Sequence, residues 1–212
     1  MSPQYLQIDC NSPDKACVEA IAAEVSSGGV IVYPTDTIYG IGCDAFNSAA
    51  VDKVNSIKRR GSGQPLLVLI PGVDWVQRLA AEIPPCCEPL MRRFWPGPLT
   101  LILRASEFAP RWVMGNSSSI GIRWAKNPFL QALLDEVGGP IVSTSANVSG
   151  GAPLLEPKKG HQELLQQVDM VVDGGPLAGK ESTVLDLSGD LPKLLREGQT
   201  TRSNLESVLG RF

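Results

Sequence analysis

Residues 29–40, GVIVYPTDTIYG, join a short apolar run to a loop rich in hydroxyl groups. The apolar part is β-branched and is closed by Pro34, which predicts a buried strand. The polar part, from Thr35 to Gly40, follows that strand directly. Open α/β sheets bind their ligands beyond the carboxyl ends of strands. The stretch therefore predicts an α/β protein with a ligand site after this strand.

Outward from this stretch, apolar runs alternate with segments of helical periodicity. The first helix is expected between Ser12, a candidate cap, and Gly28, because Cys17, Ile21 and Val25 share one face. The alternation predicts an α/β or α+β fold in a single domain, residues 1–212. The other expected helices cover 48–58, 75–81, 86–95, 127–137 and 204–209, and the other expected strands cover 66–70, 99–103, 120–123, 140–143, 170–172, 183–186 and 193–195.

Charge and composition exclude several classes of protein. The 19 basic residues do not outnumber the 22 acidic ones, and the net charge of −3 disfavours binding to nucleic acid through bulk charge. A single histidine, His161, rules out a metal site built from several histidines, and we expect it to be solvated at the start of a helix. No apolar run is long enough for a membrane span.

The cysteines indicate a reducing environment. There are five of them, an odd number, with one adjacent pair and no CxxC motif. This pattern argues against a disulfide framework and against a zinc site. We therefore expect reduced thiols and a cytoplasmic location. The five are Cys10, Cys17, Cys43, Cys86 and Cys87.

Three polar segments, at residues 34–40, 143–150 and 181–183, are each expected to follow the end of an apolar strand, and all are rich in hydroxyls. Taken singly, such a segment is explained by turns and helix caps. Several cations accompany them: Lys58 and Arg60 after a helix, and Arg123 and Arg196 at strand ends. Cations beside hydroxyls, without a histidine base or a carboxylate dyad, favour nucleotidyl transfer, in which charge stabilisation of phosphates dominates. No Walker A or GxGxxG motif is present.

Six short motifs follow one another along the chain. They are PTDTIYGIGCDA at 34–45, KRR at 58–60, WPGPLT at 95–100, STSANVSG at 143–150, STV at 182–184 and REG at 196–198. In these motifs and in their order, over about residues 17–200, the sequence resembles the YrdC-type threonylcarbamoyl-AMP synthase family.

The resemblance implies a fold and a reaction. The fold would be a twisted sheet of parallel and antiparallel strands flanked by helices, with a large concave cavity. Threonine and bicarbonate would form a carbamate, which attacks ATP to give threonylcarbamoyl-AMP and pyrophosphate. ATP would bring Mg²⁺ with it, and no metal would be bound by the protein itself. Separate transferase proteins would pass the threonylcarbamoyl group to tRNA, so we expect weak or no direct tRNA binding and no membrane partner.

The resemblance also assigns roles to residues. Lys58, Arg60, Ser145 and Asn147 would be catalytic. The threonine-binding residues would be Thr35, Thr37, Arg123, Ser143 and Ser182. The ATP-binding residues would be Lys58, Arg60, Gln64, Ser119, Ser145, Asn147 and Arg196.

The sequence departs from the family pattern in three places, which keeps other functions open. Gln64 stands where the family usually has lysine or asparagine, Leu69 where many members have a histidine near threonine, and Ala125 where a proline is usual. One alternative is a YciO-like paralogue that binds RNA or a nucleotide without synthase activity. Another is an RNA-binding module. A third is a carbamoyl-transfer domain of the hydrogenase-maturation type.

Overall fold

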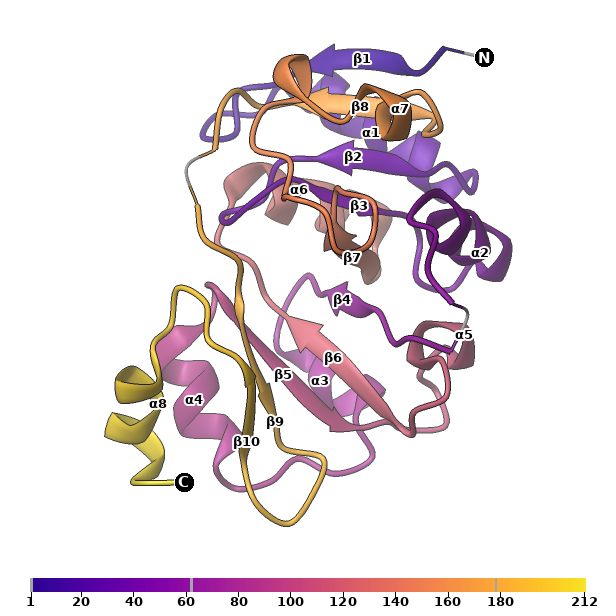
Figure 1. Cartoon of the computed structure of the whole chain (residues 1–212). Coiled ribbons are helices and arrows are strands. Elements are labelled where there is room, and N and C mark those ends of the chain that lie inside the picture. Colours follow the sequence, from indigo (N-terminus) through magenta and orange to yellow (C-terminus); the bar gives the residue numbers. More distant parts are fainter. Residues whose placement is uncertain (1, 62, 178) are drawn as a thin grey trace.

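The computed structural model describes residues 2–61, 63–177 and 179–212. Their ten strands form one mixed sheet in the order β1-β8-β2-β3-β7-β4-β6-β5-β9-β10. The sheet runs the length of the molecule, with α1 and α6 behind its upper half and α4 and α8 beside its lower half (Figure 1). Parallel and antiparallel pairings are interspersed, so the prediction of a mixed α/β fold is confirmed.

The strands are β1 (Gln4–Gln7), β2 (Ile31–Tyr33), β3 (Gly40–Gly42), β4 (Leu67–Leu69), β5 (Leu99–Arg104), β6 (Ser119–Arg123), β7 (Ile141–Ser145), β8 (Met170–Asp173), β9 (Thr183–Asp186) and β10 (Lys193–Arg196). The helices are α1 (Lys15–Ser26), α2 (Ser48–Ile57), α3 (Asp74–Leu79), α4 (Cys87–Phe94), α5 (Arg111–Met114), α6 (Pro128–Val137), α7 (Gln162–Leu165) and α8 (Arg202–Leu209). A 3₁₀ turn covers Pro157–Lys159.

Strand β2 is apolar throughout because both of its faces are buried. Ile31 and Tyr33 pack with α1 and α6 in one core cluster. Val30 and Val32 face a second, larger cluster on the other side of the sheet. Side chains alternate between the faces of a strand, so two buried faces require an uninterrupted apolar run.

Helices α1 and α6 cover the first of these faces, packed against each other. The Asn127 side chain caps α6 by accepting the amide of Leu130, and Gly138 ends the helix in a left-handed conformation. The cap of α1 is Asp14, which accepts the amide of Cys17. Ser12, the expected cap, lies two residues before it. The expectation of a cap at Ser12 is therefore wrong, because the helix starts after the next acidic residue that can accept a first-turn amide.

Three short elements were not expected from the sequence: β1, β3 and the one-turn helix α5. Strand β3 is Gly-Ile-Gly, and glycine is depleted in strands, so it resembles a loop in the sequence. The structure explains Gly42, because a Cβ there would lie 1.7 Å from the carbonyl oxygen of Val142. Glycine lets β3 approach this neighbouring backbone.

The five cysteines are free thiols, as expected. His161 is half-buried and occupies the cap position of α7, so the predicted helix start is confirmed. None of the helices within the described ranges has the length and apolar character that a membrane span requires.

Candidate functional site

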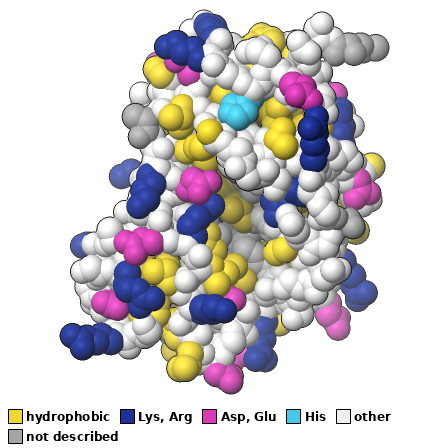
Figure 2. Space-filling view, viewed as in Figure 1, with side chains coloured by type: hydrophobic (Ala, Val, Ile, Leu, Met, Phe, Trp, Pro, Cys, Tyr) yellow, Lys and Arg dark blue, Asp and Glu magenta, His cyan; other side chains and the backbone are white. Residues whose placement is uncertain are grey.

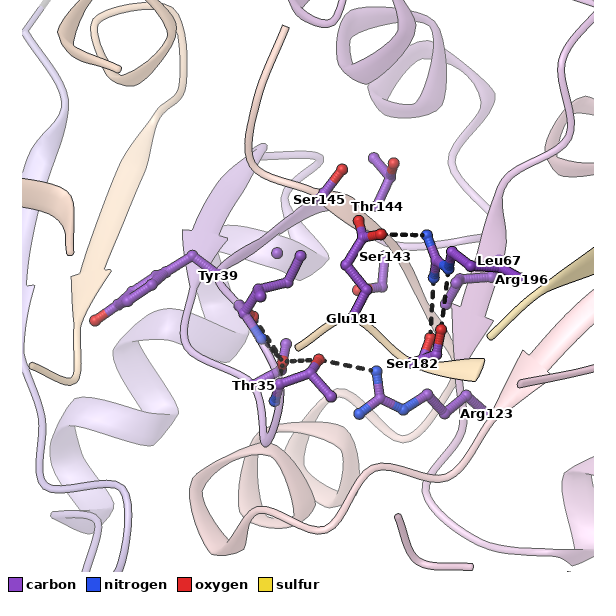
Figure 3. A pocket seen from close by; sticks show the side chains of 13 residues that line it. Thr35, Tyr39, Leu67, Arg123, Ser143, Thr144, Ser145, Glu181, Ser182 and Arg196 are labelled. Atoms are coloured by element: carbon purple, nitrogen blue, oxygen red, sulfur yellow. Dashed lines mark hydrogen bonds and ion pairs between the residues drawn. The ribbon is translucent and has the colours of Figure 1, made fainter. Parts of the chain in front are cut away.

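A pocket of about 450 Å³ opens in the middle of the sheet, where segments far apart in sequence converge. The loop between β2 and β3 forms one wall, and the ends of β6, β7 and β10 form the others (Figure 3). The segment entering β9 completes it. Most of the lining residues have polar side chains. The lining consists of Thr35, Thr37, Ile38, Tyr39, Gly40, Leu67, Arg123, Ser143, Thr144, Ser145, Glu181, Ser182 and Arg196.

A second pocket of about 660 Å³ adjoins the first and shares four lining residues with it: Leu67, Ser143, Thr144 and Arg196. Its floor is less polar, with side chains of β4, β5 and β6. The two pockets therefore adjoin along these shared residues, and we call them the two halves of the cavity. The remaining lining of the second half is Arg60, Pro65, Leu66, Thr100, Ile102, Ser119, Gly121 and Val184.

Thr35 organises the loop that follows β2. Its Oγ1 donates to the carbonyl of Ile38 at 2.6 Å and accepts the amide of Thr37 at 3.0 Å. The two threonine hydroxyls are 2.9 Å apart, and both side chains are almost fully buried. Local hydrogen bonds of this kind fix a turn without secondary structure. Thr37 is thereby held at the pocket wall.

Arg123 ends β6 with its guanidinium at the pocket, although it is only 4% exposed. Its Nη2 pairs with Asp36, its Nη1 donates to Thr37 Oγ1 at 3.3 Å, and its Nε donates to the carbonyl of Gly97 at 3.1 Å. Each terminal nitrogen carries two hydrogens, so donors remain for a ligand. Asp36 also accepts the amide of Lys126. Asp36 therefore holds a guanidinium that faces the cavity.

Arg196, at the end of β10, borders both halves of the cavity. Its Nη1 pairs with Glu181 at 3.1 Å, and its Nη2 and Nε donate to the side chain and carbonyl of Ser182. The Ser182 hydroxyl in turn lies 3.1 Å from that of Thr100. We expected residues 181–183 at the end of a strand, but they enter β9 instead. The mixed directions of the sheet bring this strand start to the same cavity.

Lys58 is buried beneath the end of β7. Its Nζ donates to the carbonyl of Ser145 and to the carbonyl and side-chain oxygens of Asn147, the latter two at 2.9 and 3.0 Å. Asn147 Oδ1 also accepts the Ser145 hydroxyl at 2.6 Å. All three ammonium protons therefore have acceptors within the chain. In this arrangement Lys58 and Asn147 anchor the segment that carries Ser145 to the pocket wall.

Arg60 reaches the second half of the cavity. It donates from Nη1 to Thr144 Oγ1 at 3.3 Å and from Nη2 to the carbonyl of Pro65 at 3.0 Å. Its Nε donates to Gln64 Oε1 at 3.1 Å, so the exposed Gln64 side chain orients the guanidinium. Ser119 lies in the same half and shares a 2.7 Å hydrogen bond with Ser117.

The cavity thus brings together most of the residues expected from sequence. Thr35, Thr37, Arg123, Ser143, Ser145, Ser182 and Arg196 line the first half, and Arg60, Ser119 and again Ser143 and Arg196 line the second. Three of the expected residues do not line the cavity but hydrogen-bond to residues that adjoin it: Lys58, Asn147 and Gln64. Leu69 packs in the core between the sheet and the α1–α6 layer.

Three residues that line or support the cavity were assigned no role from the sequence: Asp36, Thr144 and Glu181. Each belongs to one of the three hydroxyl-rich segments, so membership of those segments was the signal that could have found them. Glu181 and Asp36 are acids within hydroxyl-rich runs. No group of three or more His, Cys, Asp and Glu side chains suited to a metal ion occurs in the described ranges.

Comparison with known proteins places this cavity in context. The sequence pattern of the Sua5, YciO and YrdC family, described as "telomere recombination", matches residues 23–198. The threonylcarbamoyl-AMP synthase of Bacillus subtilis is 37% identical over 207 residues, which are 96% of this chain and 59% of that protein. The chain therefore spans well under two thirds of this relative.

Two solved structures have a similar fold. P. abyssi Sua5 complexed with L-threonine superposes with a TM-score of 0.91 at 31% identity, over 97% of this chain and 61% of that one. E. coli YciO superposes with a TM-score of 0.85 at 30% identity, over 93% of this chain and 96% of that one. The fold is thus shared by a structure that contains threonine and by one whose length matches this chain.

Proposed function

We propose that this chain, which belongs to the Sua5, YciO and YrdC family, condenses threonine, bicarbonate and ATP into threonylcarbamoyl-AMP and pyrophosphate. One observation carries the proposal: the cavity has two adjoining halves with a shared wall, which suit an amino acid and a nucleotide. The printed name of the B. subtilis relative supports it. So does the threonine complex of Sua5.

In the proposed arrangement the first half of the cavity binds threonine. The Arg123 guanidinium is suited to the substrate carboxylate, because its fork of donors matches two carboxylate oxygens. The hydroxyls of Thr35, Thr37, Ser143 and Ser182 supply donors and acceptors for the remaining polar groups. The partly enclosed site limits the water that reaches a labile carbamate.

The second half binds ATP, with Arg60, Ser119 and Arg196 toward the phosphates. The carbamate oxygen forms a bond to the α-phosphorus, and the bond from that phosphorus to pyrophosphate breaks. Guanidinium groups that are already in position when the reaction begins stabilise the charge that develops on the leaving pyrophosphate. Arg196 borders both halves, which puts one cation where the two substrates meet. Lys58, Asn147 and Ser145 act as a unit that shapes this meeting point. Mg²⁺ arrives with ATP as part of the substrate.

The product would pass to a separate transferase that modifies tRNA, with little direct tRNA binding by this chain. Lysine and arginine side chains are interspersed with acidic ones over the face shown in Figure 2, so no extended basic stripe is offered there. The net charge of −3 supports the same view. Free thiols support action in the reducing cytoplasm.

The main test is whether pyrophosphate release from ATP requires threonine and bicarbonate together. We expect mass spectrometry to detect threonylcarbamoyl-AMP only when all three are present. A YciO-like protein without synthase activity remains the second candidate, because E. coli YciO matches both fold and length. Nucleotide binding with no threonine-dependent pyrophosphate would support that candidate and reject the synthase.

A second prediction concerns pH. Burial and the positive charge of Arg60 lower the pKa of Lys58 from 10.5 to about 8. Above that pH the neutral amine has two N–H groups for three acceptor oxygens, so the anchor of the Ser145–Asn147 segment weakens. We expect pyrophosphate release to fall with a midpoint near pH 8.

Stability should change in the opposite direction, which separates this effect from unfolding. Between about pH 8 and 10.5 the unfolded chain retains the Lys58 proton that the folded chain has lost. The free energy of unfolding therefore rises with pH in this window. Between pH 7 and pH 10, urea unfolding should show that the free energy of unfolding of the wild type rises, relative to that of Lys58→Met, by on the order of 2 kcal/mol. A constant difference would contradict the assignment to Lys58.

A further inference from the structure

We propose that Glu181 recognises the α-ammonium group of the amino-acid substrate. The inference rests on the proposed function and adds a residue that determines substrate specificity. Of the described residues that line the first half of the cavity, Glu181 alone carries a carboxylate. Its neighbours in Figure 3 are hydroxyl groups and the guanidinium of Arg196.

The charges around the cavity favour such a group. An amino acid enters as a zwitterion, and Arg123 offers the match for its carboxylate. The ammonium then lies in a partly enclosed site that already contains two guanidinium groups, Arg123 and Arg196. Transfer of a cation from water into these surroundings costs free energy unless an anion lies close to it. Asp36 does not line the pocket; its carboxylate pairs with Arg123 and accepts the amide of Lys126.

Glu181 has an oxygen available for this contact. Its Oε2 accepts Arg196 Nη1 at 3.1 Å, whereas Oε1 accepts no hydrogen bond from any residue in the described ranges. The backbone is fixed on either side, because the Glu181 carbonyl accepts the amide of Gln199 at 3.1 Å and the next residue, Ser182, is buried. The carboxylate is therefore positioned before the substrate arrives.

A different role for Glu181 would be to neutralise Arg196 alone. Arg196 is also held by two hydrogen bonds to Ser182, so its position does not depend on Glu181. The two roles give different expectations for a ligand that has an amino group. If Glu181 only neutralises Arg196, its removal frees a cation and takes no attractive contact from a carboxylate ligand, whereas ammonium recognition predicts that a ligand with an amine is weakened.

The test combines a residue change with a ligand change. Calorimetric titrations use threonine and (R)-3-hydroxybutanoate, which is threonine without its amino group, against wild type and Glu181→Gln. We expect the substitution to weaken threonine by on the order of tenfold or more, the size of a lost charge-assisted contact. The affinity for (R)-3-hydroxybutanoate should not fall, because this anion loses no contact when the carboxylate is removed, and its retained binding also shows that the pocket of the variant is intact. Glu197→Gln, one residue beyond Arg196 and exposed, serves as the control and should bind threonine as wild type does.

An equal loss for both ligands, or no loss for either, would overturn the role of Glu181 while leaving the synthase proposal standing. Failure of the wild type to bind threonine at all would overturn the proposed function and this inference with it. The affinity for ATP is measured in parallel and should be unchanged in Glu181→Gln. A changed affinity for ATP, together with equal effects on threonine and (R)-3-hydroxybutanoate, would mean that Glu181 only neutralises Arg196.

Discussion

Replacing Arg123 with glutamine is expected to remove threonine binding and to lower the free energy of unfolding by about 3–5 kcal/mol. The Arg123 side chain is 5% exposed and that of its partner Asp36 is 12% exposed. Removal of the guanidinium leaves a buried carboxylate without its counter-charge, which is the costly way to break a buried ion pair. Urea unfolding measures the stability, and calorimetric titration with threonine measures the binding.

The double variant Asp36→Asn/Arg123→Gln separates the two effects. It removes the unpaired charge, so we expect it to recover most of the lost stability. Threonine binding should not return, because the donor for the substrate carboxylate is still missing. Arg92→Gln is the control: its ion pair with Glu88 is exposed, and its loss should cost less than about 1 kcal/mol. Restored threonine binding in the double variant would show that Arg123 does not hold the substrate.

The sequence predicts the parts of the site that belong to one continuous segment. The run that becomes β2 is apolar on both faces, and hydroxyl-bearing residues follow it directly. Because a change from apolar to polar residues marks the end of a buried strand, strand and loop can be recognised together. The same holds for β7 and its polar end. Partnerships between distant segments are different. Asp36 and Arg123 are 87 positions apart, and no local pattern shows that one neutralises the other.

Lys58 and Arg60 illustrate a second limit of sequence reasoning. The resemblance to the family implied that both face ATP. Arg59 adopts a positive φ of 53°, so the chain turns sharply between them. Lys58 enters the buried contacts with Ser145 and Asn147, whereas Arg60 reaches the cavity. The direction in which a side chain points depends on this single backbone angle, which composition and spacing do not reveal.

Replacing Gly198 with alanine is expected to lower synthase activity by on the order of 10²-fold, although Gly198 touches no substrate. A Cβ at this position would lie 2.1 Å from the carbonyl oxygen of Glu181 and 2.4 Å from the carbonyl carbon of Ser182. Both are backbone atoms, so the segments entering β9 and leaving β10 must move apart. Overpacking of this kind also costs about 1–3 kcal/mol of stability.

The loss of activity follows from what these two segments carry. Glu181 and Ser182 precede β9, Arg196 ends β10, and the three are joined by the contacts that Gly198 permits. Their separation displaces the cation at the junction of the two proposed substrate sites, and a displacement of about 1 Å is enough for an effect of this size. Gly189→Ala is the matched control, because Gly189 lies in the connection between the same two strands and a Cβ there meets no described atom within 4 Å. Steady-state pyrophosphate release at saturating threonine and ATP compares the variants. Equal rates for Gly198→Ala and Gly189→Ala would mean that catalysis does not depend on how closely β9 and β10 hold Arg196 to Ser182.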